Sequence, residues 1–305
     1  MDNYHQRYLA EEVAEDHALG LMTRREAIRR LGMMGFSVFG ASALLAACGG
    51  DDDDVAPDST STSPSTAAST QTTTATGAAD TTETITYPSG RATPLTGAWA
   101  QATDAKGAVV VIHENRGLVP HIRSVASRLA ASGYSAIAVD LLSEEGGSAT
   151  VGEDDAGAAL NGIDGTRFVA DVKSTLDELA KREPGAKLGL IGFCFGGTTA
   201  WAVLDSGEPR LAAAAPFYGT VEPDVDFTGT TAAVLGVYGE TDDRVNATRD
   251  AAEAALEKAG LTHELRTFPG TGHAFFNEAN PARYNATQAA AAYEAVLDWF
   301  GRHLA

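Results

Sequence analysis

The sequence has 305 residues, of which 44% are hydrophobic, so the chain can bury a sizeable core. Its formal net charge is −19, and no run of Lys and Arg follows residue 30, which argues against nucleic acid as a partner. The two cysteines, Cys48 and Cys194, are too few for a disulfide framework. Because His and Cys pairs at zinc-ligand spacing are also lacking, the sequence predicts neither a metal site nor a cofactor.

Residues 1–47 are organised like an export signal. The paired Arg24 and Arg25 precede an uncharged run over residues 31–47, which is too short to indicate a membrane-spanning helix. The stretch TRREAI (23–28) resembles the twin-arginine signal, which directs the export of proteins that have already folded. We therefore expect an exported protein that resides in the cell envelope or periplasm.

The signal ends in LAAC (45–48), which resembles a bacterial lipobox. In that interpretation Cys48 is lipidated, becomes the mature N-terminus and anchors the protein to a membrane. The alternative is an uncleaved N-terminal anchor helix with an incidental cysteine. Residues 48–80 are rich in Ser, Thr, Ala and Pro without periodicity, which predicts a disordered tether. The folded domain is then expected to span residues 81–305.

Short apolar runs alternate with amphipathic segments from residue 107 onward. The apolar runs predict strands buried on both faces, over residues 108–113, 134–140, 187–193, 211–218 and 232–239. The amphipathic segments predict helices over residues 121–132, 166–182 and 282–303. This alternation indicates an α/β fold with a mostly parallel sheet flanked by helices.

Other segments extend this sheet and surround its edge. Residues 84–87 and 95–101 predict an antiparallel hairpin, and residues 263–268 predict another strand. The segment 143–165 is rich in Gly and acidic residues and is expected to be a loop near the mouth of the sheet. Functional groups gather at the carboxyl ends of strands in such sheets, so the residues that follow each strand are candidates.

The run IGFCFGG (191–197) has the glycine frame of a nucleophile elbow with cysteine in place of serine. Gly192 and Gly196 leave room in a tight strand-to-helix turn, where side chains would collide. The helix N-terminus beyond the turn favours negative charge and lowers the pKa of a thiol. Cys194 is therefore the candidate nucleophile, and the alternative is a small buried apolar cysteine.

A triad on this fold needs an acid and then a histidine after the nucleophile. Asp242 and Asp243 follow the strand predicted over residues 232–239, and we prefer Asp242 because it comes first after the turn. His273 lies in a glycine-rich loop after the strand 263–268 and is the candidate base. The alternatives are a solvated aspartate and a structural loop histidine. His121 and His263 fall on a predicted helix and strand without evident partners, which argues against them as the base.

The motifs IGFCFGG, YGETDDRV (238–245), GTGHAFF (270–276) and VIHENRGL (111–118) together resemble the dienelactone hydrolase family of α/β-hydrolases. The resemblance covers about residues 84–305, nearly all of the expected folded part. It implies the α/β-hydrolase fold and a hydrolase of small carboxylic esters or lactones that needs no metal or cofactor. Within the family, HENRGL is the most specific motif, because a generic hydrolase needs no glutamate there.

The resemblance also implies roles for individual residues. Glu114 would interact with the thiol of Cys194 and help to activate it when substrate arrives. The backbone N–H groups of Phe195 and Asn115 would form the oxyanion hole. Three side chains are candidates to line the substrate pocket: Arg116, Tyr218 and Trp201. For Arg116 the alternative is a structural loop arginine, and for Trp201 it is a core residue.

One departure from the family concerns the substrate. Enzymes acting on dienelactone grip its carboxylate with arginines, one of them shortly after the catalytic histidine, but residues 274–277 read AFFN and residues 140–147 are acidic. We therefore expect hydrolase chemistry on another small ester or lactone. One alternative is a catalytically weak or inactive surface-tethered binding protein on the same fold. Another is a redox sensor, which would need a resolving thiol, whereas the only other cysteine, Cys48, is the expected lipidation site.

Overall fold

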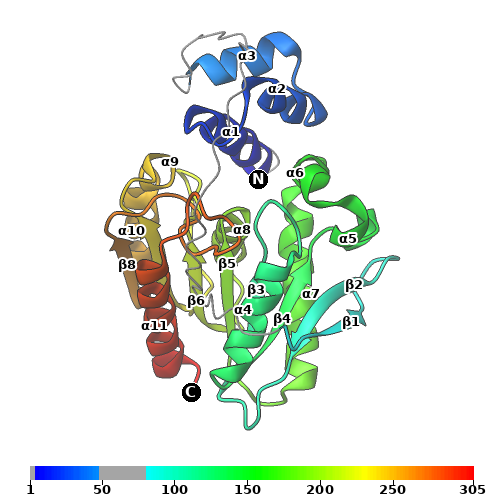
Figure 1. Cartoon of the computed structure of the whole chain (residues 1–305). Coiled ribbons are helices and arrows are strands. Elements are labelled where there is room, and N and C mark those ends of the chain that lie inside the picture. Colours follow the sequence, from blue (N-terminus) through cyan, green and yellow to red (C-terminus); the bar gives the residue numbers. More distant parts are fainter. Residues whose placement is uncertain (1–3, 48–79) are drawn as a thin grey trace, which may run out of the picture.

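The computed structural model describes residues 4–47 and 80–305 of the chain (Figure 1). The predicted lipidation site Cys48 and nearly all of the predicted tether lie outside these residues. In the described part, a large α/β layer structure carries a smaller group of three N-terminal helices at one end.

An eight-stranded sheet forms the centre of the molecule, with the strand order β1-β2-β4-β3-β5-β6-β7-β8. Its strands are β1 (Glu83–Tyr87), β2 (Leu95–Ala100), β3 (Gly107–Ile112), β4 (Tyr134–Asp140), β5 (Leu188–Phe193), β6 (Leu211–Phe217), β7 (Ala233–Gly239) and β8 (His263–Phe268). The hairpin β1–β2 is antiparallel and joins β4 antiparallel, whereas the remaining pairs are parallel. Every predicted strand and the predicted hairpin are confirmed.

Helices cover both faces of the sheet, as expected for parallel strands whose side chains are buried on both sides. They are α4 (Pro120–Ala131), α7 (Gly165–Arg182), α8 (Phe195–Asp205), α10 (Arg249–Lys258) and α11 (Ala286–His303). Helices α4 and α11 form one layer, where the Arg128 guanidinium lies 4.4 Å from the centre of the Tyr293 ring. Helices α7 and α8 pack together in the other layer. This arrangement confirms the predicted fold class.

The segment 143–165 was predicted to be a loop, and that prediction is wrong in part. It contains a 3₁₀ turn (Ser143–Glu145) and the helices α5 (Ser148–Val151) and α6 (Glu153–Asn161). Asp140, the last residue of β4, accepts hydrogen bonds from the backbone N–H and the hydroxyl of Ser148, at 2.8 and 2.6 Å. The buried Asp140 carboxylate thus satisfies donors at the first residue of α5.

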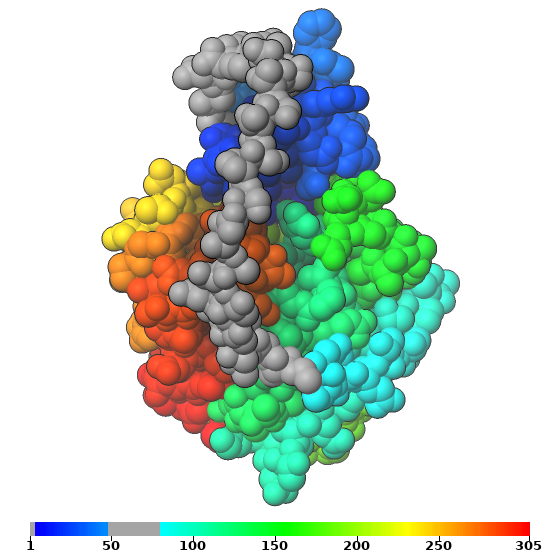
Figure 2. Space-filling model, viewed as in Figure 1, coloured from blue at the N-terminus to red at the C-terminus, as the bar shows by residue number. Residues whose placement is uncertain are grey.

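The N-terminal residues fold into α1 (Tyr4–Ala18), α2 (Arg24–Met33) and α3 (Val38–Ala47). Small and apolar side chains hold the three together: Ala10, Val13, Ala14, Ala27, Leu31, Ala41 and Leu45. The group lies over the carboxyl edge of the sheet, where α1 contacts α6 and α8 (Figures 1 and 2). In residues 4–47 and 80–305, no helix combines the length and the apolar character needed to cross a membrane. The export signal itself stays a prediction.

Candidate active site

The nucleophile elbow forms as the glycine frame predicts. Cys194 lies between β5 and α8 with φ +58°, a backbone conformation that residues other than glycine rarely adopt. A Cβ on Gly192 would collide with the backbone of Gly196, and a Cβ on Gly196 would lie 2.6 Å from the carbonyl oxygen of His113. The two glycines therefore permit the close approach of strand and helix that places the buried Cys194 side chain at the carboxyl edge of the sheet.

The sheet register brings the predicted residues of β3 and β5 to the same edge. Ile112 of β3 pairs with Gly192 of β5, so Glu114 and Cys194 each lie two residues beyond a paired position. Tyr218 follows β6 directly, and its ring lies edge-on to the imidazole of His273 with centroids 5.0 Å apart. Because parallel strands end together, residues far apart in sequence meet here.

His273 and Asp242 form a buried pair. Nδ1 of His273 lies 2.7 Å from Oδ2 of Asp242, and both side chains are almost completely buried. Asp243, the alternative acid, is exposed in the first turn of α9 (Asp243–Asn246). Burial disfavours the charged form of both groups, but the attraction between the two charges is stronger. The pKa of Asp242 is therefore lowered and the pKa of His273 is raised. This pair fixes the imidazole with Nε2 directed away from the acid.

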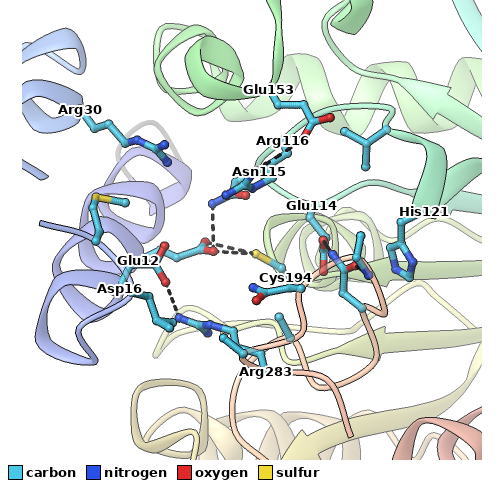
Figure 3. Close-up of a pocket in the computed structure, with 18 of the residues that line it drawn as sticks. Glu12, Asp16, Arg30, Glu114, Asn115, Arg116, His121, Glu153, Cys194 and Arg283 are labelled. Atoms are coloured by element: carbon cyan, nitrogen blue, oxygen red, sulfur yellow. Dashed lines mark hydrogen bonds and ion pairs between the residues drawn. The ribbon is translucent and has the colours of Figure 1, made fainter. Parts of the chain in front are cut away.

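A carboxylate from α1 lies against the thiol of Cys194 (Figure 3). The thiol donates to Glu12, whose two oxygens are 3.1 and 3.2 Å from Sγ, and the Tyr8 hydroxyl donates to Sγ at 3.3 Å. Asn115 Nδ2 donates to Glu12 Oε1 at 2.9 Å. Glu12, Cys194 and His273 each offer one atom that could bind a metal ion, and these three atoms all lie within 4.8 Å of one another. This trio has ligand types that zinc accepts, although each takes part in hydrogen bonds within the protein.

The surroundings keep the thiol protonated. Burial raises the pKa of Cys194 well above its ordinary value, and the negative charges of Glu12 and Glu114 raise it further. Burial also raises the pKa of Glu12, against the attraction of His273. A thiolate is the reactive form of cysteine, so Cys194 is in its unreactive, protonated form in this structure.

Glu114 lies in the pocket but differs from expectation in its partner. Its carboxylate accepts hydrogen bonds from Asn277 Nδ2 and, at 3.5 Å, from the Tyr218 hydroxyl. The thiol instead donates to Glu12, because α1 brings that carboxylate closer. Glu114 therefore acts on Cys194 through its charge in this structure.

The remaining predicted residues lie at different depths. Arg116 is half exposed at the pocket rim, 3.5 Å from Glu153, and Phe195 begins α8 next to the elbow. Trp201 stacks on Phe227 in the core, in agreement with the alternative for that residue. His121 was predicted to lack a partner, which is wrong: its Nδ1 lies 2.8 Å from Glu278.

The pocket has a volume of about 650 Å³, and besides the predicted Cys194, Glu114, Asn115 and Arg116 it is also lined by residues that were not predicted. Glu12 and Asp16 come from α1, and Arg283 comes from the segment before α11. Residues 274–277 lack an arginine, but Arg283 still supplies a cation to the pocket. A signal for α1 was present in the sequence, because Tyr4, Tyr8 and Glu12 recur every four residues on one helical face.

Fold and site together define an α/β-hydrolase with cysteine at the nucleophile elbow. The model of the dienelactone hydrolase family matches residues 95–304. An Escherichia coli O157:H7 protein named "Putative carboxymethylenebutenolidase" is 32% identical over 211 residues, covering 64% of this chain and 76% of its own. A Synechocystis protein of the same name is 33% identical over 220 residues, covering 64% and 86%.

A solved structure agrees with these relatives. A Klebsiella pneumoniae protein named "Putative Dienelactone Hydrolase" aligns with a TM-score of 0.65 and 26% identity, over 73% of this chain and 98% of its own. The chain belongs to the dienelactone hydrolase family and is a hydrolase of ester or lactone bonds. The family match begins at residue 95, so α1, α2 and α3 lie outside it.

Proposed function

We propose that the chain hydrolyses small carboxylic esters or lactones with a Cys194–His273–Asp242 triad. The observation that carries this proposal is the buried hydrogen bond between His273 Nδ1 and Asp242 Oδ2, beside a cysteine on a strained elbow. Asp242 holds the imidazole in the tautomer that leaves Nε2 able to accept a proton. Cys194 presents its sulfur within 4.8 Å of a ring nitrogen of His273.

In the first half-reaction, His273 takes the thiol proton and the Cys194 sulfur attacks the carbonyl carbon. The backbone N–H groups of Phe195 and Asn115 hold the developing oxyanion. The tetrahedral intermediate collapses to a thioester, and the imidazolium gives its proton to the departing alkoxide. For a lactone, the alkoxide remains part of the same molecule.

In the second half-reaction, His273 takes a proton from a water molecule, which attacks the thioester carbonyl. The second tetrahedral intermediate expels the sulfur of Cys194, and the imidazolium returns its proton to that sulfur. The acid product leaves and the triad is restored. Throughout, the Asp242 carboxylate stabilises the imidazolium without itself accepting a proton.

Glu114 has a separate role in this proposal. Its negative charge contributes to the raised pKa of Cys194 and so keeps the thiol protonated while no substrate is bound. A protonated thiol resists oxidation, which is useful to a protein in an oxidising compartment. Hydrogen bonds from Asn277 and Tyr218 hold the Glu114 carboxylate in position.

Two arginines lie in or near the substrate pocket. Arg283 lines the pocket, and Arg244 lies close by with its guanidinium 4.5 Å from the centre of the Tyr8 ring. Arg283 carries positive charge at the pocket wall, so an acidic group on the substrate would be tolerated there. The assay panel therefore includes lactones with and without a free carboxylate.

The decisive experiment uses residues 81–305, which contain the whole of the family match over residues 95–304. Hydrolysis of p-nitrophenyl acetate and of the lactones is compared for the unmodified fragment, Cys194→Ala and His273→Ala. Intact-mass measurement records any acyl adduct. Loss of turnover in both variants, with an adduct only where Cys194 is present, is the expected result. Turnover that survives in Cys194→Ala would contradict the triad.

We also propose that residues 1–47 are a twin-arginine export signal and that Cys48 is lipidated, which places the protein in the cell envelope or periplasm. The position of Arg24 and Arg25 supports this proposal, because both are exposed at the start of α2. The test compares the chain with Cys48→Ala in cells fed a radiolabelled fatty acid. Equal label on both proteins would refute lipidation.

A further inference from the structure

We propose that helix α1 is an intramolecular inhibitor that occupies the substrate position of the active site until residues 1–47 are separated from the catalytic domain. The mouth of the catalytic domain is, on this view, a binding surface for an acidic helix of its own chain. This inhibition presupposes the proposed role of Cys194 as nucleophile. It adds a regulatory function to a segment that lies outside the family match.

The Glu12 carboxylate and a substrate cannot be bound together. Both carboxylate oxygens lie within 3.2 Å of the Cys194 sulfur, on the side where the thiol donates its proton. A carbonyl carbon about to be attacked must come to roughly 3–3.5 Å from the same sulfur. Figure 3 shows Glu12 reaching from α1 to Cys194 across the pocket, so any ester must first displace it.

Helix α1 also engages the other groups that catalysis needs. The Tyr8 hydroxyl donates to the Cys194 sulfur and lies 3.5 Å from Nε2 of His273. Asn115 donates its side-chain N–H to Glu12. The thiol proton is thereby directed to Glu12 instead of the imidazole, and the path between nucleophile and base is filled by a tyrosine.

Apolar burial and ion pairs hold α1 in place. Tyr8 and Leu9 are each 1% exposed and belong to the main core of the catalytic domain. Glu15 lies 2.7 Å from Arg244, and Asp16 forms an ion pair with Arg283; all four side chains are less than a quarter exposed. Charge pairs of this kind orient a partner as well as bind it. The arginines near the active site thus meet acidic side chains of α1.

The other N-terminal helices support this position. The back of α1 packs on α2 and α3, and Arg30 of α2 lies 3.4 Å from Asp154 of α6. All three helices precede Cys48, so the cleavage proposed there would release the inhibitor in one step. The exposed arginines at the start of α2 remain accessible while α1 is docked.

A rival hypothesis assigns α1 the opposite effect. If Tyr8 and Glu12 completed the active site as part of a lid, displacement of α1 would lower turnover. If α1 is an inhibitor, displacement must raise both turnover and the reactivity of Cys194. The sign of the change therefore separates the two hypotheses.

The test uses the full chain with Cys48→Ala, which leaves Cys194 as its sole cysteine and keeps α1 attached. Glu15→Arg with Asp16→Arg converts both ion pairs into repulsions and so undocks α1. Glu11→Arg is the matched control, because Glu11 is on the same helix, has a 38% exposed side chain and pairs with Arg7 of α1 itself. Two rates are measured: alkylation of Cys194 by iodoacetamide, followed by intact mass, and hydrolysis of p-nitrophenyl acetate.

We expect the double reversal to raise both rates by about tenfold or more, since breaking buried charge pairs commonly costs at least that factor in affinity. The control should stay within about twofold of the starting chain. A second pair, Tyr8→Ala with Glu12→Ala, removes the side chains that touch the sulfur and should act in the same direction. Circular dichroism verifies that each variant is folded.

The outcomes separate this inference from the proposed function. If the starting chain hydrolyses the ester and both pairs of variants show equal or lower rates of alkylation and hydrolysis, inhibition by α1 is refuted and the proposed hydrolase activity stands. Faster alkylation without hydrolysis in any variant would uphold the blocking contact and refute the catalytic proposal. Faster alkylation together with faster hydrolysis supports both.

Discussion

Replacing Asp242 by asparagine tests the triad without changing the size of the side chain. The carboxylate lies 2.7 Å from Nδ1 of His273, and both groups are buried, so solvent cannot replace the lost charge. An asparagine can offer its amide N–H to Nδ1, which would leave the imidazole proton on Nε2. In that tautomer His273 cannot accept the thiol proton of Cys194.

The expected loss follows from this change of tautomer. Removal of the acid from a buried triad, with its geometry retained, lowers kcat by about 10³–10⁴, or roughly 4–5.5 kcal/mol of transition-state stabilisation. Asp242 also accepts a hydrogen bond from the backbone N–H of Val245 at 3.3 Å at the start of α9. We expect at most about 0.5 kcal/mol of lost stability from this cap, because asparagine is an equally good N-cap.

The assay measures kcat and kcat/KM for residues 81–305 across pH, with Asp243→Asn as the matched control. Asp243 is exposed, so its substitution should leave both constants within about twofold. Circular dichroism and thermal unfolding establish that each variant is folded. A loss below tenfold for Asp242→Asn, or a larger loss for Asp243→Asn, would refute the assignment of the acid.

Three further predictions concern stability. Gly196→Ala should destabilise the fold by about 3 kcal/mol or more because its Cβ meets backbone carbonyls, whereas Gly185→Ala, with φ +83° and open space, should cost only about 1 kcal/mol; equal changes in melting temperature would contradict this. Burial lowers the pKa of His273, but the Asp242 charge raises it by more, so the net pKa is raised. The stability that the His273–Asp242 pair gives the folded state is therefore fully present below about pH 6.5 and is lost as the pH rises through the raised pKa. Urea unfolding should therefore show the free energy of unfolding falling over that range relative to His273→Asn, and parallel profiles would count against the coupling. Asp140→Ala leaves buried donors unsatisfied and should cost about 2–3 kcal/mol, and a loss under 1 kcal/mol would show that the segment after β4 does not depend on it.

The sheet and the elbow could be predicted from the sequence because their signals are local. The apolar run over residues 134–140 follows Gly133 and ends in Asp140, and it forms a strand with those limits. Gly192 and Gly196 frame the cysteine within five residues, so the turn is visible without tertiary information. The order of nucleophile, acid and histidine then follows from the order of the strands.

The docking of α1 could not be predicted in this way because its contacts are long-range. Tyr8 and Cys194 are 186 positions apart, and the helical face that carries Tyr8 and Glu12 is also compatible with a solvated signal segment. Arg283 escaped prediction for a similar reason, since the path of the chain after His273 decides whether its side chain reaches the pocket. In residues 143–165, α5 begins at Ser148, whose backbone N–H and hydroxyl bond to the Asp140 carboxylate eight residues earlier, a contact that the composition of the segment does not reveal.

Two carboxylates, Glu12 and Glu114, keep the Cys194 thiol protonated. Glu12 belongs to the segment that the proposed signal cleavage removes, whereas Glu114 belongs to the catalytic domain that remains. Burial raises the pKa of Cys194, and the charges of Glu12 and Glu114 add to that effect. Glu114 is part of the catalytic domain and can respond to substrate, whereas Glu12 lies before Cys48 and would leave with the proposed signal. A chain that folds before export would thus carry a thiol that is both protonated and covered. Since oxidation and premature reaction both need an accessible thiolate, one separation step would convert a protected cysteine into a working nucleophile.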